Sequence, residues 1–208
     1  MQGEKLLRTE FNINYINVAS RKNEVEHCIV RLIISTLATP AEIAGITKKD
    51  IRRYRDFHTV RLRSGRKVRV SPLDKRTYDL LTRISADKSS SQQIFPLDED
   101  EIDEIVKRNS PPGSVYSASG LRKAVMDIIA DSIFFEVEED ISSIKDVDRL
   151  YAVFHDTNPI YSGVWDLEDD EDLLDFLASF EKYIGEKSLE EISEIISEPF
   201  ERLRNLKV

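Results

Sequence analysis

Apolar positions in this chain recur mainly with the spacing of an α-helix. Between residues 23 and 37 they fall on one side of a helical projection, at Val25, Cys28, Ile29, Leu32, Ile33 and Leu37. The same spacing predicts further helices over residues 75–84, 98–108, 120–134, 141–154, 170–183 and 188–206, the last kinked by Pro199. Most of the chain is therefore predicted to be helical.

Short segments near the first of these helices carry other local signals. Thr39 and Glu42 have the spacing of a capping box, and Pro40 stands at the first helical position. Residues 47–54 repeat the pattern more weakly, so we expect a helical turn there. The stretch FNINYINV, at residues 11–18, is weakly strand-like.

Residues 57–73 have the pattern of a β-hairpin. The stretches FHTVRLR and RKVRVSP alternate apolar and polar residues on either side of Ser64-Gly65, where glycine supplies the positive φ of a tight turn. We expect one face to bury Val60 and Leu62, and the other to present the cations of both strands: Arg61, Arg63, Lys67 and Arg69. The predicted fold class is α+β, mostly α with a small antiparallel sheet.

Length and composition limit the kind of protein. With 208 residues, 40% of them apolar, the chain can build a sizeable core. We expect a basic segment with the hairpin at residues 1–84 and an acidic helical remainder at residues 85–208 of the same domain. No apolar run of about 18 residues would span a membrane, and the N-terminus lacks the apolar region of a secretory signal.

Candidate cofactor and redox chemistry is sparse. The one cysteine, Cys28, cannot form an intramolecular disulfide, and His27, His58 and His155 lie far apart without metal-ligand spacing. We find no glycine-rich phosphate loop. These observations predict no metal, no cofactor and a cytoplasmic location, next to the nucleoid if DNA is bound.

Charge is distributed unevenly along the chain. The net charge is −9, yet residues 1–84 hold 18 Lys and Arg against 9 Asp and Glu, which leaves −18 for residues 85–208. Because arginine and lysine suit phosphate oxygens, we expect double-stranded DNA as partner. A hairpin kept soluble by its charge is the alternative. The candidate DNA-binding residues are Lys48, Lys49, Arg52, Arg53, Arg61, Arg63, Arg66, Lys67 and Arg69.

An ordered series of motifs runs from about residue 25 to residue 130. LIISTLATPAEIAGITKKDI is followed by VRLRSGRKVRVSPLDKRTYDLL, then by IFP and SASGLRKAVMDII. This series resembles the catalytic domain of the tyrosine recombinases (phage integrase type). That family has a T-G-L-R-x-S-E-L box, a D-I dipeptide, a three-stranded sheet with a β-turn lysine ending in R-x-V-P-L, an H-x-L-R-H box and a nucleophilic tyrosine. The resemblance implies DNA recombination or integration.

The resemblance also implies candidate catalytic residues. Arg122 matches the arginine of the second box, and Lys67, or less closely Arg66, matches the β-turn lysine. His155 and Tyr161 match the His/Trp position and the nucleophile, at a shorter interval than the family uses. If the chain is an enzyme, it is a tyrosine site-specific recombinase.

Two positions depart from the family pattern. Thr39 stands where the first catalytic arginine belongs, and Ser119 stands at the histidine position of the second box. Loss of one preorganised donor costs about hundredfold to thousandfold in rate. We therefore expect a DNA-binding protein with an integrase-like fold that lacks full strand-cleavage activity.

Two other functions fit the sequence. TPAEIAGITKKDIRRYRDF, at residues 39–57, can be read as the two helices of a winged helix-turn-helix regulator, with the hairpin as its wing. Alternatively, the acidic C-terminal helices form an interaction module for a basic partner. The sequence leaves open whether the chain forms homo-oligomers.

Overall fold

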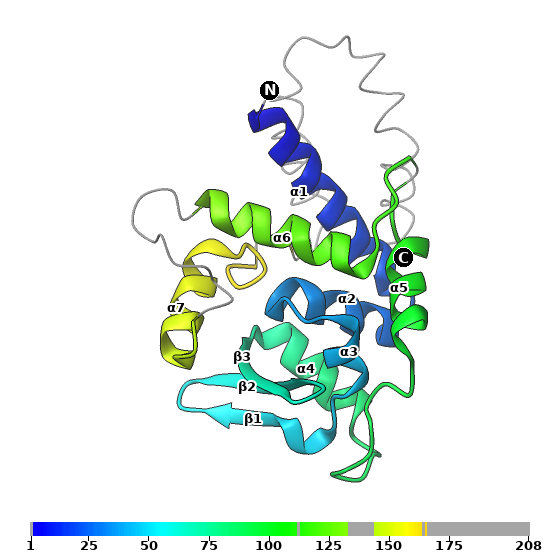
Figure 1. Ribbon diagram of the computed structural model, residues 1–208, viewed down its shortest axis with the longest axis vertical. Coiled ribbons are helices and arrows are strands. Elements are labelled where there is room, and N and C mark those ends of the chain that lie inside the picture. The colour runs from blue at the N-terminus through cyan, green and yellow to red at the C-terminus, as the bar shows by residue number, and fades with distance from the viewer. Residues whose placement is uncertain (1, 112, 133–143, 164, 166–208) are drawn as a thin grey trace.

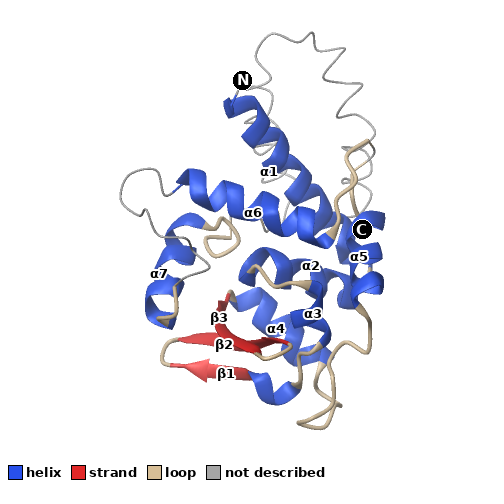
Figure 2. Ribbon diagram, in the orientation of Figure 1, coloured by secondary structure: helices blue, strands red, loops and turns tan. Residues whose placement is uncertain are grey.

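The computed structural model describes residues 2–111, 113–132, 144–163 and 165. These residues form mostly helices, with one three-stranded antiparallel sheet (Figures 1 and 2). The helices are α1 (Gln2–Ala19), α2 (Glu24–Thr36), α3 (Pro40–Ala44), α4 (Lys75–Ile84), α5 (Glu99–Arg108), α6 (Ala118–Ser132) and α7 (Val147–Thr157), with 3₁₀ turns η1 (Ser20–Lys22) and η2 (Lys48–Asp50). The strands are β1 (Ile51–Tyr54), β2 (Phe57–Ser64) and β3 (Lys67–Leu73). The predicted α+β class is confirmed.

Helix α2 is the centre of the core. Figure 1 shows it between α6 above and the sheet below, and it contacts α1, α4, α5, α6 and β3. Every residue from Glu26 to Thr36 is buried, whereas Val25 is 38% exposed. The predicted one-sided apolar stripe was therefore too narrow, because neighbouring elements cover α2 on all sides.

The ends of α2 are set by local sequence. The Asn23 side chain accepts hydrogen bonds from the amides of Val25 and Glu26 and caps the N-terminus. At the C-terminus Leu37 adopts a left-handed conformation with φ 55°, which is uncommon for a residue other than glycine. This turn directs the chain into α3.

The sheet has the order β1-β2-β3. The predicted hairpin is confirmed, with Ser64 paired to Lys67 and Gly65 at φ 57°. The helical turn expected over residues 47–54 is wrong beyond η2, because residues 51–54 pair with β2 as strand β1. The helix-turn-helix interpretation fails for the same reason, since its second helix is a strand.

The faces of the hairpin also differ from the expectation. Leu62 lies opposite Arg69 across the two strands, so these two side chains share a face. Arg61 and Arg63 lie opposite Val70 and Val68, on the other face. The four cations are therefore divided between the two faces of the hairpin. A shift of the register by one residue would have placed them on the same face, because such a shift moves a strand's side chains to the opposite face.

The N-terminal stretch is helical, so its strand-like appearance was misleading. Residues 11–20 lie in α1 and η1 and are all buried. The asparagines that created the alternating pattern bond within the fold: Asn12 Nδ2 donates to the Tyr116 hydroxyl (3.1 Å), and Asn17 Nδ2 donates to the Trp165 carbonyl (2.8 Å). The Asn14 amide nitrogen bonds locally, to the Glu10 carbonyl (3.2 Å). The tertiary partners of Asn12 and Asn17 are not revealed by a local sequence pattern.

The helices predicted at 75–84, 98–108, 120–134 and 141–154 correspond to α4, α5, α6 and α7, but α7 begins later and ends later than predicted, at Val147 and Thr157. Residues 133–134 and 141–143 of these predictions lie outside the described residues. The helices predicted at 170–183 and 188–206, with Pro199, lie outside the described residues. None of the described helices combines the length and apolar content that crossing a membrane requires. One apolar cluster runs from Ile13 to Trp165 and includes side chains of each of the helices α1 to α7 given above.

Candidate nucleic-acid interface

A cleft of about 870 Å³ opens between the β2–β3 hairpin, the end of α2, α6 and residues 144–154. Its wall is largely apolar, with Val68, Val70, Met126, Leu150 and Phe154 among the lining residues. One acidic residue, Glu42, and four cations also line it. Two of the cations, Lys67 and Arg69, lie on β3; Arg122 lies on α6 and Lys145 just before α7.

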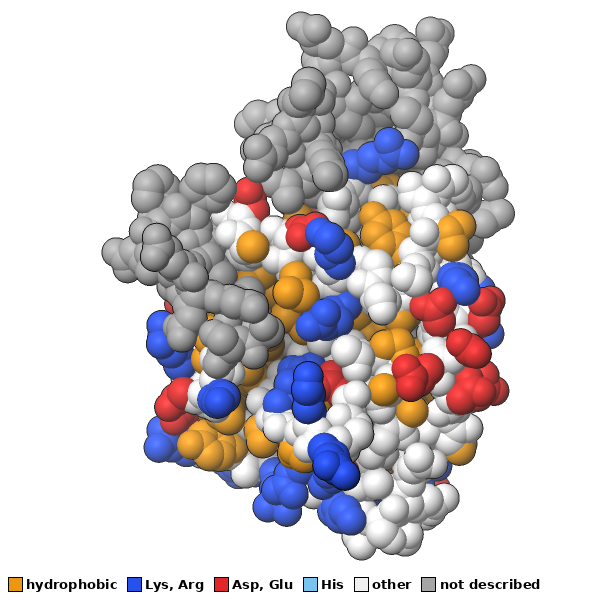
Figure 3. All heavy atoms as spheres, viewed as in Figure 1, with side chains coloured by type: hydrophobic (Ala, Val, Ile, Leu, Met, Phe, Trp, Pro, Cys, Tyr) orange, Lys and Arg blue, Asp and Glu red, His pale blue; other side chains and the backbone are white. Residues whose placement is uncertain are grey.

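The surface around the cleft has one predominant charge. Figure 3 shows Lys and Arg side chains gathered from the middle of this face down to the sheet, while Asp and Glu gather over α5. Helix α5 carries Glu99, Asp100 and Glu101 in its first turn. Cations therefore predominate around the sheet on this face, with single acidic side chains among them, and acidic side chains predominate over α5.

Three of the four cleft cations form no ion pair with a described residue and keep N–H donors that are not used within the described part of the chain. Arg122 is half-buried on α6, and its Nε donates to the carbonyl of Leu37 (2.8 Å). Its terminal nitrogens make no hydrogen bond or ion pair with another described residue, and the same holds for the ammonium groups of Lys67 and Lys145, which are exposed. These groups can take an anion from solution.

Arg69 is held differently. Its guanidinium forms a two-pronged ion pair with Glu42 (2.7 and 2.8 Å) and donates to the carbonyls of Thr36 and Leu37 (3.0 Å each). Burial raises the pKa of Glu42, but the bonds from Arg69 outweigh this and leave that pKa below its usual value. Four of the five N–H donors of Arg69 are thus used within the fold.

Arg63 is held in a similar way on the other face of the hairpin. It pairs with the buried Asp50 through both terminal nitrogens (2.6 and 2.9 Å). Burial raises the pKa of Asp50, and the contacts from Arg63 and Thr47 outweigh it, so the pKa is lowered. The charge of Arg63 is therefore balanced by a partner inside the protein.

The other predicted DNA-binding residues lie around the sheet. Lys48 Nζ donates to the Ala86 carbonyl (2.8 Å) and so ties down the loop before α5. Arg55, which was not predicted, pairs with Asp148 of α7 (2.9 Å). No ion pair within the described residues involves the remaining five: Lys49, Arg52, Arg53, Arg61 and Arg66.

The candidate nucleophile Tyr161 is not among the residues that line the cleft. Its hydroxyl has one proton to donate and lies within hydrogen-bond distance of the carbonyls of Pro72 (2.9 Å) and Ser35 (3.2 Å). Tyr161 borders a second cleft, of about 720 Å³. Burial raises the pKa of Tyr161 well above its ordinary value. His155 is exposed on α7 beside Asp156. The structure thus gathers Lys67 and Arg122, and leaves His155 and Tyr161 outside the cleft.

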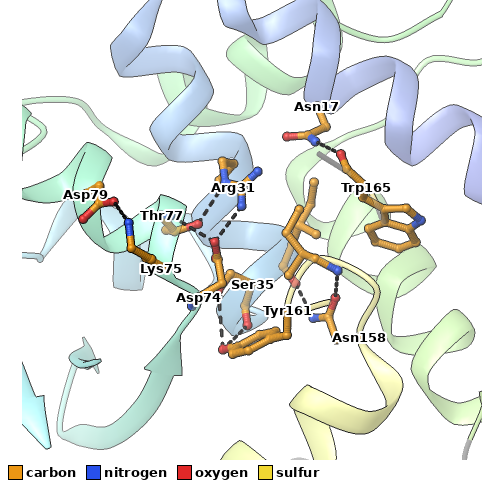
Figure 4. A network of polar contacts seen from close by, with 12 residues as sticks. Asn17, Arg31, Ser35, Asp74, Lys75, Thr77, Asp79, Asn158, Tyr161 and Trp165 are labelled. Atoms are coloured by element: carbon orange, nitrogen blue, oxygen red, sulfur yellow. Dashed lines mark hydrogen bonds and ion pairs between the residues drawn. The ribbon is translucent and has the colours of Figure 1, made fainter. Parts of the chain in front are cut away.

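Figure 4 shows what holds Tyr161 in place. The buried pair Arg31–Asp74 (2.6 Å) joins α2 to the start of α4, and Thr77 donates its amide to Asp74. Asn158 Nδ2 donates to the Ile34 carbonyl (2.9 Å). The bonds of Asn158 and Tyr161 therefore fix the segment after α7 against α2 and β3, beside the Arg31–Asp74 pair that joins α2 to α4.

The two positions that depart from the family pattern have local roles. Thr39 caps α3: its hydroxyl accepts from the Glu42 amide (3.3 Å), and Glu42 accepts from the Thr39 amide (2.9 Å). The predicted capping box is confirmed. Thr39 also lines the cleft, and Ser119 is exposed in the first turn of α6.

Sequence reasoning missed Lys145 as a cleft residue. It belongs to none of the motifs and directly precedes Asp146, whose side chain caps α7 by accepting from the Arg149 amide (2.9 Å). The cap could be found from the sequence, but the packing of α7 against β3 could not. Among the described residues, no three His, Cys, Asp or Glu side chains are grouped so as to hold a metal ion.

This arrangement of helices around a three-stranded sheet resembles the fold of a tyrosine recombinase. The structure matches that of XerA recombinase with a TM-score of 0.51 and 12% sequence identity, over 82% of this chain and 63% of that chain. The chain therefore spans less than two thirds of the XerA structure, and the likeness is one of fold.

At the level of sequence, no protein-family profile matches the chain. It is 40% identical over 193 residues to an uncharacterised protein of Archaeoglobus fulgidus (strain ATCC 49558 / DSM 4304 / JCM 9628 / NBRC 100126 / VC-16). The match covers 91% of this chain and 86% of its relative. The chain belongs to the same family as that protein.

Proposed function

We propose that this protein binds duplex DNA by placing a stretch of phosphate backbone across the cleft, without completing strand cleavage. The observation that carries the proposal is the cleft itself. It collects Lys67, Arg122 and Lys145 from three separate elements, each with donors that no described side chain occupies. The recombinase-like fold gives DNA preference over other polyanions.

The chemistry of these three residues suits a phosphodiester. The terminal nitrogens of Arg122 can donate two parallel hydrogen bonds to one phosphate, and the lysines add compact charges on either side. Each neutralised phosphate releases counterions, with a slope of about −0.9 in log affinity against log salt. Three contacts would give a slope of about −2.7 from the cleft.

The proposal that cleavage is incomplete rests on what surrounds the cleft. Thr39 supplies no positive charge, and its hydroxyl is engaged in the cap of α3. Tyr161 is bonded to two backbone carbonyls elsewhere. Stabilisation of a transferring phosphoryl group depends on preorganised donors, and ground-state binding by the remaining cations does not by itself lower the barrier.

Single substitutions on α6 test the binding proposal. Arg122→Met should weaken binding to a fluorescent 25-base-pair duplex by about tenfold, the value of one or more charge-assisted hydrogen bonds. Lys123→Met is the matched control, because Lys123 is the next residue, is exposed and pairs with Asp127 (2.8 Å) outside the cleft. Equal affinities for both variants and the unsubstituted protein would exclude the cleft as the DNA site.

A further inference from the structure

We propose that Arg69 is a positioning residue for Arg122 and not itself a DNA ligand. The inference rests on the proposed function of the cleft and assigns Arg69 a role that the hairpin pattern does not suggest. Arg69 and Arg122 lie 53 positions apart in the sequence, on β3 and α6, yet both donate to the carbonyl oxygen of Leu37. That shared oxygen is the link between them.

The Leu37 carbonyl is placed by the end of α2. The left-handed conformation of Leu37 ends the helix, its amide donates to the Ile33 carbonyl (3.0 Å), and the residue is buried. The last carbonyls of a helix carry partial negative charge and lack intrahelical donors. Arg69 takes up the carbonyls of Thr36 and Leu37, and Arg122 Nε takes the second position on Leu37.

Glu42 allows the two guanidinium groups to share one oxygen. Two adjacent cations repel each other, but the two-pronged pair with Glu42 balances the charge of Arg69. The Arg122 charge has no such partner among the described residues. Because Nε of Arg122 is fixed on Leu37, its terminal nitrogens are held at the cleft with less freedom to lose when a phosphate binds.

The chain offers a matched comparison in Arg63. Like Arg69, it leaves the hairpin to form a two-pronged pair with a carboxylate, that of Asp50. It shares no bond with Leu37 or Arg122. Replacing Arg63 therefore reproduces the loss of an arginine, its charge and its ion pair, without disturbing the orientation of Arg122.

A double-mutant cycle on DNA affinity separates positioning from direct contact. If Arg69 acts through Arg122, Arg69→Met should weaken binding by about tenfold, as Arg122→Met does, and the double variant should bind within about twofold of Arg122→Met alone. Arg63→Met should add its own effect fully to that of Arg122→Met. In the double variant of Arg69 and Arg122, the salt slope should be smaller by about 0.9 in total, which corresponds to the loss of one phosphate contact and not of two.

Free protein supplies a readout that does not depend on DNA. The Nε–H signal of Arg122, assigned by its loss in Arg122→Lys, should exchange slowly with solvent in the unsubstituted protein and in Arg63→Met, and at least about tenfold faster in Arg69→Met. If Arg69→Met does not fold, Glu42→Gln serves in its place, because it removes the charge that holds Arg69.

The outcomes are distinct. Additive losses in the Arg69/Arg122 cycle, or an unchanged Arg122 Nε–H in a folded Arg69→Met variant, would overturn the positioning role. If Arg122→Met leaves DNA affinity unchanged, the proposed function fails, while the exchange measurement still decides whether Arg69 orients Arg122.

Discussion

Replacing Asp74 with asparagine should lower the free energy of unfolding by about 3–5 kcal/mol, the cost of breaking a buried ion pair by removing one partner. Arg31 is fully buried and the Asp74 side chain is 5% exposed. Asparagine keeps the size of the side chain and can still accept from the Thr77 amide as the N-cap of α4. The loss would therefore report the missing charge beside Arg31.

The effect should depend on pH in a defined direction. Burial raises the pKa of Asp74, but Arg31 and the Thr77 bonds outweigh it, so the folded-state pKa lies below the ordinary 3.8. A lowered carboxyl pKa contributes stability that is fully present above the unfolded pKa and is lost as pH falls through the folded pKa. The difference between the two proteins should be constant near pH 7 and shrink below about pH 4.

Urea unfolding followed by circular dichroism and by fluorescence of Trp165, the one tryptophan of the chain, measures both quantities. Trp165 is buried and directly follows the segment after α7 that bonds to α2 and β3, near the Arg31–Asp74 pair. Asp79→Asn is the control, because Asp79 pairs with the exposed Lys75 on the same helix and should cost less than about 1 kcal/mol. A loss below 1 kcal/mol for Asp74→Asn, or a loss that grows as pH falls, would refute the reasoning.

Four further expectations follow from the structure. Tyr161→Phe should lower the free energy of unfolding in urea by about 1 kcal/mol, because it removes the hydroxyl that bonds to Pro72 and Ser35. The unsubstituted protein should form no covalent adduct with a nicked DNA substrate. An adduct that disappears in Tyr161→Phe would contradict this. Thr39→Arg should bind DNA more tightly, since position 39 lines the cleft, while losing about 1 kcal/mol of stability with the α3 cap; unchanged affinity in the folded variant would contradict it. Cys28 is fully buried, which raises the pKa of its thiol, so it should react with a thiol reagent only as the protein unfolds, and rapid native-state labelling would be the contrary result.

Local signals predicted the elements that depend on local chemistry. The helix predicted over residues 23–37 forms as α2, the Thr39 cap is present, and the hairpin turn includes Gly65 as predicted but consists of Gly65 and Arg66, one residue later than expected. Each depends on a few neighbouring residues, a cap, a proline or a positive φ, which a single sequence displays directly. The motif order likewise indicated the recombinase-like fold.

The errors arose where tertiary contacts decide. Residues 51–54 pair with β2, although a short capping box suggested a continuing helix. The asparagines of residues 11–18 imitate a strand pattern, but they lie in a buried helix, where Asn12 and Asn17 bond to distant partners. The prediction that the four hairpin cations share one face is wrong. The alternation within each strand does not fix the register between the two strands, because that register is set by pairing and packing.

The candidate site was predictable only in part. Lys67 and Arg122 were identified through the motifs, and the fold brings both to one cleft. No sequence motif pointed to Lys145. The hydrogen bonds of Arg69 to Glu42 and to two backbone carbonyls depend on where α2 ends in the fold. Such roles depend on which residues lie close together in the fold. Composition therefore identified a basic hairpin but did not show which of its cations form ion pairs within the protein.

The most direct test of the central claim compares two triple variants of equal net charge. One removes the cleft cations, Lys67→Met, Arg122→Met and Lys145→Met. The other removes three cations paired elsewhere on the surface, Lys75→Met, Arg83→Met and Lys123→Met. Duplex affinity measured over a range of salt concentrations should fall at least about hundredfold in the first variant, with a slope reduced by about 2.7. It should remain within about threefold of the unsubstituted protein in the second. Equal losses in the two variants would show that total charge, and not the cleft, governs DNA binding.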